Sequence, residues 1–233
     1  VEQKHLVGKQ YEGQVQNLRA MVHRMSDEVV LQLTGEKGVH TTRIAYAMVQ
    51  GEGKEIFVAD FDGANLKQVT QNQSINLSPV WSPEGTRLAY LSFRQKFPSI
   101  FILEADGSIT RLPTGGGDLA WNKEGTGFFY TRYPYDGERA AADRNFYQQV
   151  YFHVLGTPTE QDIYVIGDQF PAIAEVAFET SPDNQYVTAQ VANGDGGEFA
   201  HYLLEPSGEW KQITHHEDGI PTVEFGPDNS LYL

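Results

Sequence analysis

The stretch Trp81-Ser-Pro-Glu-Gly-Thr-Arg-Leu-Ala-Tyr90 recurs along the chain, and its recurrence predicts the architecture. A close copy is Trp121-Asn-Lys-Glu-Gly-Thr-Gly-Phe-Phe-Tyr130, and weaker copies are Thr180-Ser-Pro-Asp-Asn-Gln-Tyr-Val187 and Phe225-Gly-Pro-Asp-Asn-Ser-Leu-Tyr232. Each copy reads as a strand end, a tight turn and a second strand, because proline presets φ and glycine or asparagine tolerates a positive φ. One hairpin repeated about every 40–45 residues is typical of a β-propeller, with one copy in each blade.

Short β-rich segments surround these turns in groups of four. Complete groups cover residues 77–112, 118–166 and 175–214, whereas the group at 43–70 has three strands and lacks the usual innermost one. We therefore predict an all-β fold, a β-propeller of about four four-stranded antiparallel blades, closed or partial. We expect the spare strand Thr222–Phe225 to pair with the first blade and close the ring, which would remove exposed strand edges.

The last residues do not fit a closed ring. Leu231–Leu233 duplicates a strand that Arg43–Met48 already supplies. Two alternatives therefore stay open, namely an open arc of blades and two arcs that complete each other between chains. The first corresponds to a monomer and the second to a dimer that completes a ring.

An amphipathic helix is predicted between Gln14 and Leu33. The apolar residues recur with the spacing of one helix face, and Gly35 is positioned to end the helix; they are Leu18, Met21, Val22, Met25, Val29, Val30 and Leu33. We expect this face to pack on a sheet edge or to close one end of the propeller. The chain then divides into an N-terminal helical segment, residues 1–38, and a propeller domain, residues 39–233.

Composition excludes several kinds of function. The formal net charge of −14 disfavours nucleic acid and anionic membranes as partners. It fits either a well-solvated surface or a mouth that attracts basic partners or cations. The chain has no cysteine, which rules out disulfides, thiolate metal sites and a cysteine nucleophile. No apolar run reaches the roughly 18 residues of a membrane span, and the first residues lack the apolar core of a signal peptide.

Several segments in the first half share a family pattern. They are Thr41-Thr-Arg-Ile-Ala-Tyr-Ala47, Val58-Ala-Asp-Phe-Asp-Gly-Ala-Asn65 and Leu77-Ser-Pro-Val-Trp-Ser-Pro-Glu-Gly-Thr-Arg-Leu-Ala-Tyr90. Over about residues 14–112 the chain resembles the TolB family, the periplasmic propeller of the Tol–Pal envelope system. Met25–Gly38 looks like the last helix of the N-terminal domain of that family. The resemblance implies a rim that contacts the lipoprotein Pal.

The second half resembles a different family. Asp118–Pro134, Asn145–Pro158 and Glu160–Val165 are similar to the propeller of prolyl oligopeptidases, and the match covers about residues 117–233. We therefore interpret the chain as a chimera, of natural or engineered origin. It is TolB-like to about residue 115 and peptidase-like after it. Blades of both parents are four-stranded units, so their apolar layers can stack across the join.

The chain is not expected to be an enzyme. In prolyl oligopeptidases the serine, aspartate and histidine of the triad belong to a separate hydrolase domain, and the propeller only filters access. The sequence contains no Gly-x-Ser-x-Gly turn to carry a nucleophile. We predict no cofactor and no metal. His215–Asp218 reads as a polar loop rather than a zinc site, and Asp60–Gly63 reads as a hairpin turn because Gln71 stands where a calcium loop needs glutamate.

Recognition at the channel mouth is the activity that remains. The loops that lead into the innermost strands are Gln71–Asn76, Pro113–Asp118, Gly167–Ala172 and His215–Ile220. The candidate binding residues are Leu77, Ser78, Asp118, Asp168, His215 and His216, of which Leu77, Ser78 and Asp118 follow from the TolB motif. The long loop 133–148 is either a partner-binding element or a surface excursion with a short helix. The recurring aromatics Trp81, Trp121, Tyr90 and Tyr130 are read as packing residues between sheets.

Three functions are carried forward. The first is a non-catalytic propeller that binds a protein or peptide at the channel mouth. The second is the gating propeller of a prolyl oligopeptidase-type serine peptidase without its catalytic domain. The third is a TolB-like Tol–Pal binding module with a Pal-like partner. The TolB resemblance implies the periplasm and the peptidase resemblance implies the cytoplasm, so the location stays open.

Overall fold

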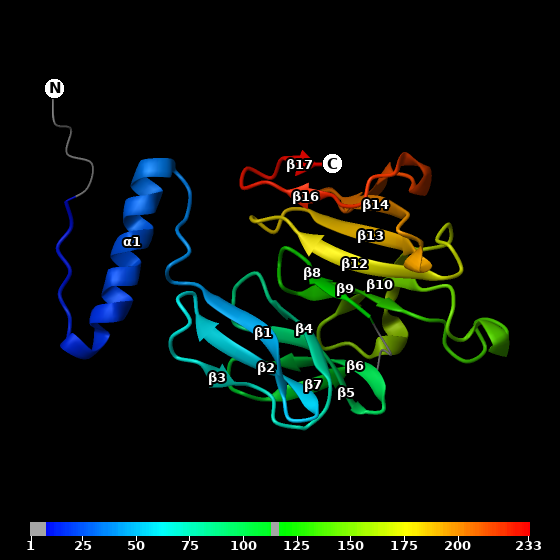
Figure 1. The fold of residues 1–233 in the computed structure, drawn as a ribbon, viewed down its shortest axis with the longest axis horizontal. Coiled ribbons are helices and arrows are strands. Elements are labelled where there is room, and N and C mark those ends of the chain that lie inside the picture. Colours follow the sequence, from blue (N-terminus) through cyan, green and yellow to red (C-terminus); the bar gives the residue numbers. More distant parts are fainter. Residues whose placement is uncertain (1–7, 113–116) are drawn as a thin grey trace.

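The fold is a row of antiparallel sheets standing side by side (Figure 1). The computed structural model describes residues 8–112 and 117–233. The first sheet has three strands, β1 (Arg43–Gln50), β2 (Gly53–Asp60) and β3 (Lys67–Gln68), in that order. The predicted groups of strands are thus confirmed, because each alternating segment forms a ladder with the next across a tight turn.

Three four-stranded sheets follow, each a meander of consecutive strands. The second sheet holds β4 (Asn76–Trp81), β5 (Leu88–Gln95), β6 (Phe97–Leu103) and β7 (Ile109–Leu112). The third holds β8 (Leu119–Trp121), β9 (Gly127–Arg132), β10 (Gln149–Val154) and β11 (Ile163–Ile166), and the fourth holds β12 (Ala174–Thr180), β13 (Val187–Asn193), β14 (Phe199–Leu204) and β15 (Trp210–Thr214). A fifth, two-stranded sheet is formed by β16 (Glu224–Phe225) and β17 (Leu231–Tyr232). Short 3-10 turns are η1 (Val15–Asn17), η2 (Ala141–Asp143), η3 (Thr159–Gln161), η4 (Gly194–Gly196) and η5 (His216–Asp218).

The core consists of apolar layers between neighbouring sheets. Tyr90 and Phe101 pack between the first and second sheets, and Trp121 and Phe128 pack between the second and third. Tyr90, Trp121 and Tyr130 are at most 2% exposed, which confirms their prediction as packing residues, whereas Trp81 is half-buried. Full burial of such a side chain stabilises the fold by about 2 kcal/mol. The sheets are therefore held to one another mainly by these layers.

Hydrogen bonds at the tight turns also join neighbouring sheets. Arg43 donates from Nη2 to the carbonyl oxygen of Gly85 at 2.6 Å, and Arg87, at the same place in the next sheet, donates to that of Gly125 at 3.3 Å. The third sheet has Gly127 at this position. Its hydrogen bond to the fourth sheet is instead donated by Lys123 Nζ to Gln185 Oε1 at 2.6 Å. The repeated arginine contact thus stops where the second sequence pattern begins.

The ring is not closed, and the expected closure through Thr222–Phe225 was wrong. Glu224 and Phe225 of β16 pair with Tyr232 and Leu231 of β17, and the described ladder of β1 is with β2. The two ends of the arc carry β1 and β17 (Figure 1). The physical reason is that pairing across the short turn 226–230 closes a much smaller loop than pairing with a strand at the other end of the chain. The alternative of an open arc is the arrangement present.

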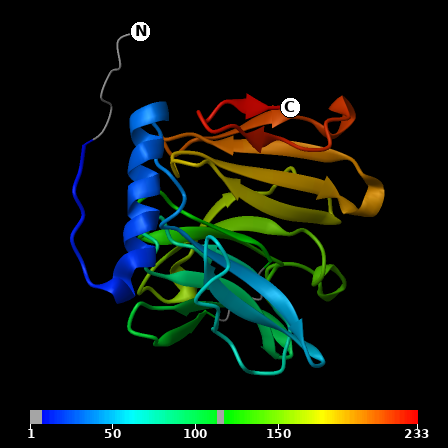
Figure 2. The ribbon, with the colours of Figure 1, turned by 60° about the vertical axis from the view of Figure 1, so that its left-hand side comes forward.

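The helix α1 (Leu18–Thr34) lies at the edge of the molecule, and its expected packing was wrong (Figures 1 and 2). Gly35, with φ +80°, ends it as predicted. None of its residues is buried, and Leu18, Val22 and Leu33 are exposed. It contacts the first sheet through ion pairs of Arg19 with Asp60 and Asp62 and through an edge contact between the rings of His23 and Phe61. Among the described residues, no helix is long and apolar enough to cross a membrane.

Candidate binding surface at the loop end of the sheets

The connections that could carry function gather at one end of the sheets. In an antiparallel meander the first and third strands start from the same end. The links between sheets and the links from second to third strand therefore share this end, which we call the loop end. Two bonds show it: Lys54 N donates to Ser74 O at 2.9 Å, and Tyr147 N donates to Ala172 O at 2.7 Å. The predicted mouth loops all lie here, although residues 113–116 of one of them are outside the described residues.

A buried carboxylate fixes the first of these loops. Glu55, which is 2% exposed, accepts hydrogen bonds from Thr70 Oγ1 at 2.5 Å and from the backbone amides of Asn72 and Gln73 at 3.0 and 2.7 Å. Asn76 Nδ2 donates a fourth bond at 3.1 Å. A buried carboxylate is stable only when its oxygens are satisfied in this way. The loop is thereby held as a rigid part of the rim.

The long loop 133–148 is anchored by a buried arginine. Arg132 binds the carboxylate of Glu138 through two nitrogens at 2.7 and 2.9 Å, and its guanidinium lies 3.8 Å from the ring centres of Tyr135 and Tyr151. The bonds from Arg132 lower the pKa of Glu138 below its usual value. Bidentate pairing and stacking both favour arginine at this position. The half of the loop nearest β9 therefore has a fixed shape.

A cavity of about 310 Å³ lies where this loop meets the fourth sheet. Its side chains come from the long loop, from the start of β12 and from the turn after β13, and we call it the rim cavity; it is lined by Tyr133, Asn145, Phe146, Ile173, Ala174, Glu175, Gly194 and Asp195. Phe146 is 40% exposed and Ile173 is 51% exposed. Exposed Glu175 and Asp195 add negative charge beside this apolar surface. Such a cavity fits an apolar side chain that has a basic neighbour.

The electrostatics of the rim cavity are acidic. Burial raises the pKa of Tyr133, and the nearby carboxylate of Glu175 raises it further. The tyrosine consequently stays a neutral hydroxyl at physiological pH. Gly194 has φ +59°, and a Cβ there would stand 2.7 Å from Cδ1 of Ile173. The positive φ favours glycine at this position, and its lack of a side chain lets the turn approach Ile173, which shapes one wall of the cavity.

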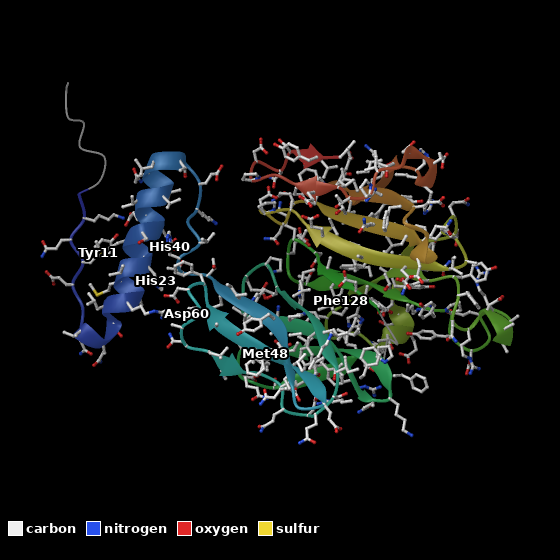
Figure 3. All side chains as sticks on the ribbon, viewed as in Figure 1. Tyr11, His23, His40, Met48, Asp60 and Phe128 are labelled. Atoms are coloured by element: carbon white, nitrogen blue, oxygen red, sulfur yellow. The ribbon has the colours of Figure 1, made fainter. Side chains whose placement is uncertain are left out.

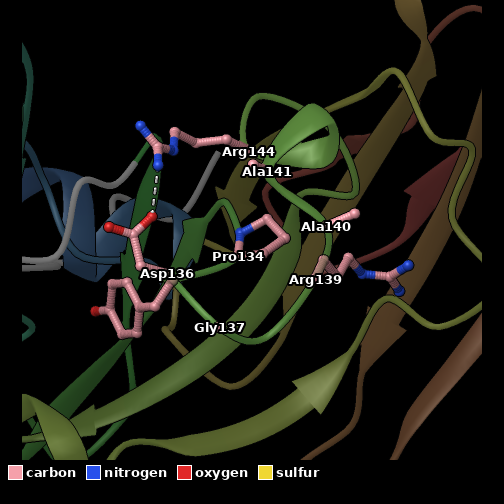
Figure 4. A pocket seen from close by; sticks show the side chains of 8 residues that line it. Pro134, Asp136, Gly137, Arg139, Ala140, Ala141 and Arg144 are labelled. Carbon is pink, nitrogen blue, oxygen red and sulfur yellow. Dashed lines mark hydrogen bonds and ion pairs between the residues drawn. The ribbon is translucent and has the colours of Figure 1, made fainter.

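A second, smaller cavity of about 250 Å³ lies within the long loop itself (Figure 4). Arg144 forms an ion pair with Asp136 at 2.9 Å. The guanidinium of Arg139 is directed away from that pair and lies 4.1 Å from the ring centre of Tyr147. Both arginines are thus already engaged in contacts within the loop. The short helix considered for this loop is present as the three-residue 3-10 turn η2.

The candidate residues taken from the TolB motif have structural contacts. Leu77 packs against the core between the second and third sheets. Ser78 is exposed with φ +47° at a bulge between Leu77 and Val80. Asp118 accepts a hydrogen bond from Phe178 N at 2.9 Å, and burial raises its pKa. Of these three residues, Ser78 is the one whose side chain is open to a partner.

The other candidates also lie at the loop end but are not brought together. Asp168 accepts a bond from Gln149 Nε2 at 3.1 Å. His215 caps η5, since its amide donates to Asp218 Oδ2 at 2.7 Å, and His216 Nε2 lies 3.1 Å from Val191 O. Among the described residues, no hydrogen bond or ion pair joins Asp168 to either histidine or to Asp118. Their roles in binding stay predictions.

Sequence reasoning missed the residues of the rim cavity. Phe146 belongs to the long loop that was considered for partner binding, but Ile173, Glu175 and Asp195 were not singled out. One signal was available in the sequence. Along innermost strand β12, Glu175, Ala177 and Glu179 alternate with the apolar Val176 and Phe178, which predicts that the first set faces outwards. Within residues 8–112 and 117–233, no group of three histidine or carboxylate side chains is placed to hold a metal ion.

The stacked meanders with one repeated turn define a β-propeller, here an open arc. Comparison with family models resolves it further: residues 109–232 match the prolyl oligopeptidase N-terminal β-propeller domain, and residues 30–114 match the TolB β-propeller domain. The chain belongs to the first of these families, whose model covers more than half of it. Both resemblances found in the sequence are confirmed, with the change of pattern at residues 109–114.

Curated proteins of the TolB type match about half of the chain or less. The Tol-Pal system protein TolB of Desulfosudis oleivorans is 42% identical over 101 residues, which is 43% of this chain. That of Methylobacillus flagellatus is 44% identical over 101 residues, and the TolB homolog of Chlorobium chlorochromatii is 42% identical over 121 residues, 51% of this chain. These matches cover 23%, 23% and 28% of the relatives, so the chain spans about a quarter of their length.

Two solved structures share the fold. A prolyl endopeptidase structure aligns with a TM-score of 0.61 and 14% identity, covering 86% of this chain and 35% of that one. TolB from Acinetobacter baumannii aligns with a TM-score of 0.51 and 19% identity, covering 91% of this chain and 63% of that one. Both likenesses confirm the propeller architecture, over 86% and 91% of the chain.

Proposed function

We propose that this chain is a non-catalytic propeller module that binds a peptide or protein segment at the loop end. The observation that carries the proposal is the rim cavity, in which Tyr133, Phe146 and Ile173 present apolar surface beside the carboxylates of Glu175 and Asp195. A segment with an apolar side chain next to lysine or arginine complements both features. The net charge of −14 supports the same choice, because it attracts basic segments from a distance.

The family match favours a second role for the same surface. In a longer protein of prolyl oligopeptidase type, the propeller would select peptides before they reach a separate catalytic domain. The absence of a Gly-x-Ser-x-Gly turn in these 233 residues supports a selecting rather than a cleaving role. The rim cavity would then discriminate by charge and size. A hydrolase domain encoded next to this sequence would favour this role.

The TolB-like half supports a third role, as a Tol–Pal binding module with a Pal-like partner. Its relatives are named as Tol-Pal system proteins, and exposed Ser78 stands in the matching motif. A periplasmic location would follow. Binding of a soluble Pal domain to the immobilised chain tests this role. Saturable binding that Ser78→Arg weakens at least tenfold supports it, and no binding at high micromolar Pal removes it.

The first role is tested with two blocked peptides of the same length. One carries two lysines flanking phenylalanine and leucine, and the other carries glutamates instead of the lysines. We expect calorimetric titration at low salt to show micromolar to millimolar affinity for the basic peptide. Glu175→Gln with Asp195→Asn should weaken it at least fivefold, because the complementary charge is lost.

Glu36→Gln is the matched control, since this exposed carboxylate lies just after α1, outside the rim cavity. It should leave the affinity unchanged. Equal affinity for both peptides, or an affinity that the Glu175 and Asp195 substitutions do not change, would show that the rim cavity is not the binding site.

A further inference from the structure

We propose that the free edge of β1 is a pairing site for strand β16 of a second copy of this polypeptide, so that two arcs join into one ring. β1 pairs with β2 over eight residue pairs, from Arg43↔Asp60 to Gln50↔Gly53. Among the described residues no strand covers its other edge. Such an edge presents unpaired amides and carbonyls that template the addition of another strand.

The side chains of β1 are those of a buried strand. Arg43-Ile-Ala-Tyr46 repeats Arg87-Leu-Ala-Tyr90, at the start of β5, almost residue by residue. Leu88 is 1% exposed, whereas Ile44, at the same place in the repeat, is 48% exposed, and Val49 near the end of β1 is 70% exposed. The difference arises because β5 has neighbours on both edges and both faces. β1 lacks an innermost strand and a preceding sheet.

An unpartnered donor marks the place of the missing strand. Trp121 of β8 donates from Nε1 to the carbonyl oxygen of Val80, in the innermost strand of the preceding sheet, at 3.2 Å. Trp81 occupies the equivalent position in β4, and its Nε1 is buried without a partner among the described residues. Leaving such a donor unsatisfied costs about 1–3 kcal/mol. The acceptor that it lacks is a carbonyl of an innermost strand in the first sheet.

Strand β16 fits this place by sequence. In the repeat, Phe225 stands where Trp81 stands and Glu224 where Val80 stands. The β4–β5 ladder pairs Trp81 with Leu88 and Val80 with Ala89. Transferred to the new edge, this register pairs Phe225 with Ile44 and Glu224 with Ala45. It also brings the Glu224 carbonyl to Nε1 of Trp81.

β16 is available for such an exchange. Its described ladder with β17 has two residue pairs, and a two-stranded ribbon of this size is marginally stable. The turn is also one residue shorter than in the second sheet, since Phe225 pairs with Leu231 where Trp81 pairs with Leu88. The eight-residue edge of β1 offers a longer ladder. Exchange therefore replaces a weak pairing with a stronger one.

A second copy supplies the strand more readily than the same chain does. The β16 of one chain lies at the opposite end of its own arc from β1 (Figure 1). Two copies related by a two-fold axis bring each β16 to the β1 of the other and leave no open end. Three complete sheets and one composite sheet from each copy make a ring of eight. This number lies within the range of about four to eight blades known for propellers.

Mass in solution is the first test. We expect light scattering of the polypeptide of residues 1–233 to give about twice the chain mass of 26.1 kDa. Ile44→Lys should return it to the chain mass, because the ring would bury the new charge. Ile163→Lys is the matched control, since Ile163 is a similarly exposed apolar residue (58%) on β11, and the dimer should persist.

The tryptophan donor gives a second readout. Trp81→Phe should weaken the dimer about tenfold, whereas Trp210→Phe should leave it unchanged although Trp210 Nε1 also has no partner among the described residues. The register is tested by disulfide formation, because the natural chain has no cysteine. Ile44→Cys with Phe225→Cys should give a linked dimer on oxidation, and Ile163→Cys with Phe225→Cys should not.

Three results would each overturn the proposal. The first is the mass of one chain at all concentrations up to about 1 mM. The second is a dimer that Ile44→Lys leaves intact. The third is a disulfide between residues 44 and 225 formed within a single chain, which would show that the arc closes on itself.

Discussion

At the scale of single residues, buried polar groups decide the shape of the loop end. The side chains of Glu55 and Arg132 are both buried, and each holds one loop in place through its contacts. Arg132 does so through Glu138 and two tyrosine rings, and Glu55 does so through two backbone amides and two side chains. Each group also has a partner in a strand, Asn76 of β4 for Glu55 and Tyr151 of β10 for Arg132. Loss of either group should therefore release one loop from its neighbouring sheet and leave the sheet ladders intact.

Glu55→Gln provides the test at this scale. A glutamine oxygen cannot accept all four of the present bonds, and its NH2 group would face the amides of Asn72 and Gln73. We expect the free energy of unfolding to fall by about 3 kcal/mol, as measured by urea denaturation. Glu52→Gln, at an exposed position three residues earlier, should change it by less than about 0.5 kcal/mol. Equal effects of the two substitutions would contradict the role given to Glu55.

At the scale of elements, α1 is held mainly by polar contacts, beside one edge contact between the rings of His23 and Phe61. Asp27 accepts bonds from the amides of His40 and Thr41 at 2.7 and 2.9 Å and from Thr41 Oγ1 at 2.6 Å. His23, His40 and Asp60 lie between the helix and the first sheet (Figure 3). Although burial opposes it, the bonds from Thr41 and His40 lower the pKa of Asp27 to about 2.

This contact predicts an acid transition of the helix. A carboxylate whose pKa is lower in the folded state stabilises that state above its unfolded pKa of about 3.8, and the contribution is lost as pH falls towards about 2. We expect hydrogen exchange of the α1 amides to accelerate between pH 4 and 2, after correction for intrinsic rates. Asp27→Asn should remove this pH dependence. An unchanged acid transition in that variant would assign it to other groups.

The elements were predictable from sequence to the extent that their signals are local. The turn residues predicted where the strands begin and end, and Gly35 predicted the end of α1. Both predictions hold because these boundaries depend on the backbone preferences of nearby residues. The packing of α1 was not predictable, since its apolar stripe indicates a partner without saying where one is. The rim cavity was missed for a related reason: its lining comes from the long loop, the start of β12 and the turn after β13, and no local signal in the sequence brings these segments together.

At the scale of the whole molecule, the sheets form a series of similar units with unfinished ends. Neighbouring sheets are joined by an apolar layer and by a hydrogen bond at a tight turn. A TolB-like sheet therefore stacks on a peptidase-like sheet through the same kind of surface. The open ends could not be derived from the repeat, because the sequence supplies both β16 and β17 for one incomplete sheet. Local pairing of these two strands leaves β1 without an inner neighbour.

Hydrogen exchange of β1 and β5, measured by NMR in dilute solution where light scattering gives the mass of one chain, tests the open arc most directly. An edge strand is bonded on one side only, so alternate amides of β1 should exchange quickly. The amides of β5 from Leu88 to Ser92, where β4 and β6 both pair with it, should be protected. Protection of every amide of β1 equal to that of Leu88–Ser92, in the single chain, would mean that β1 has an inner neighbour and that the arc is closed.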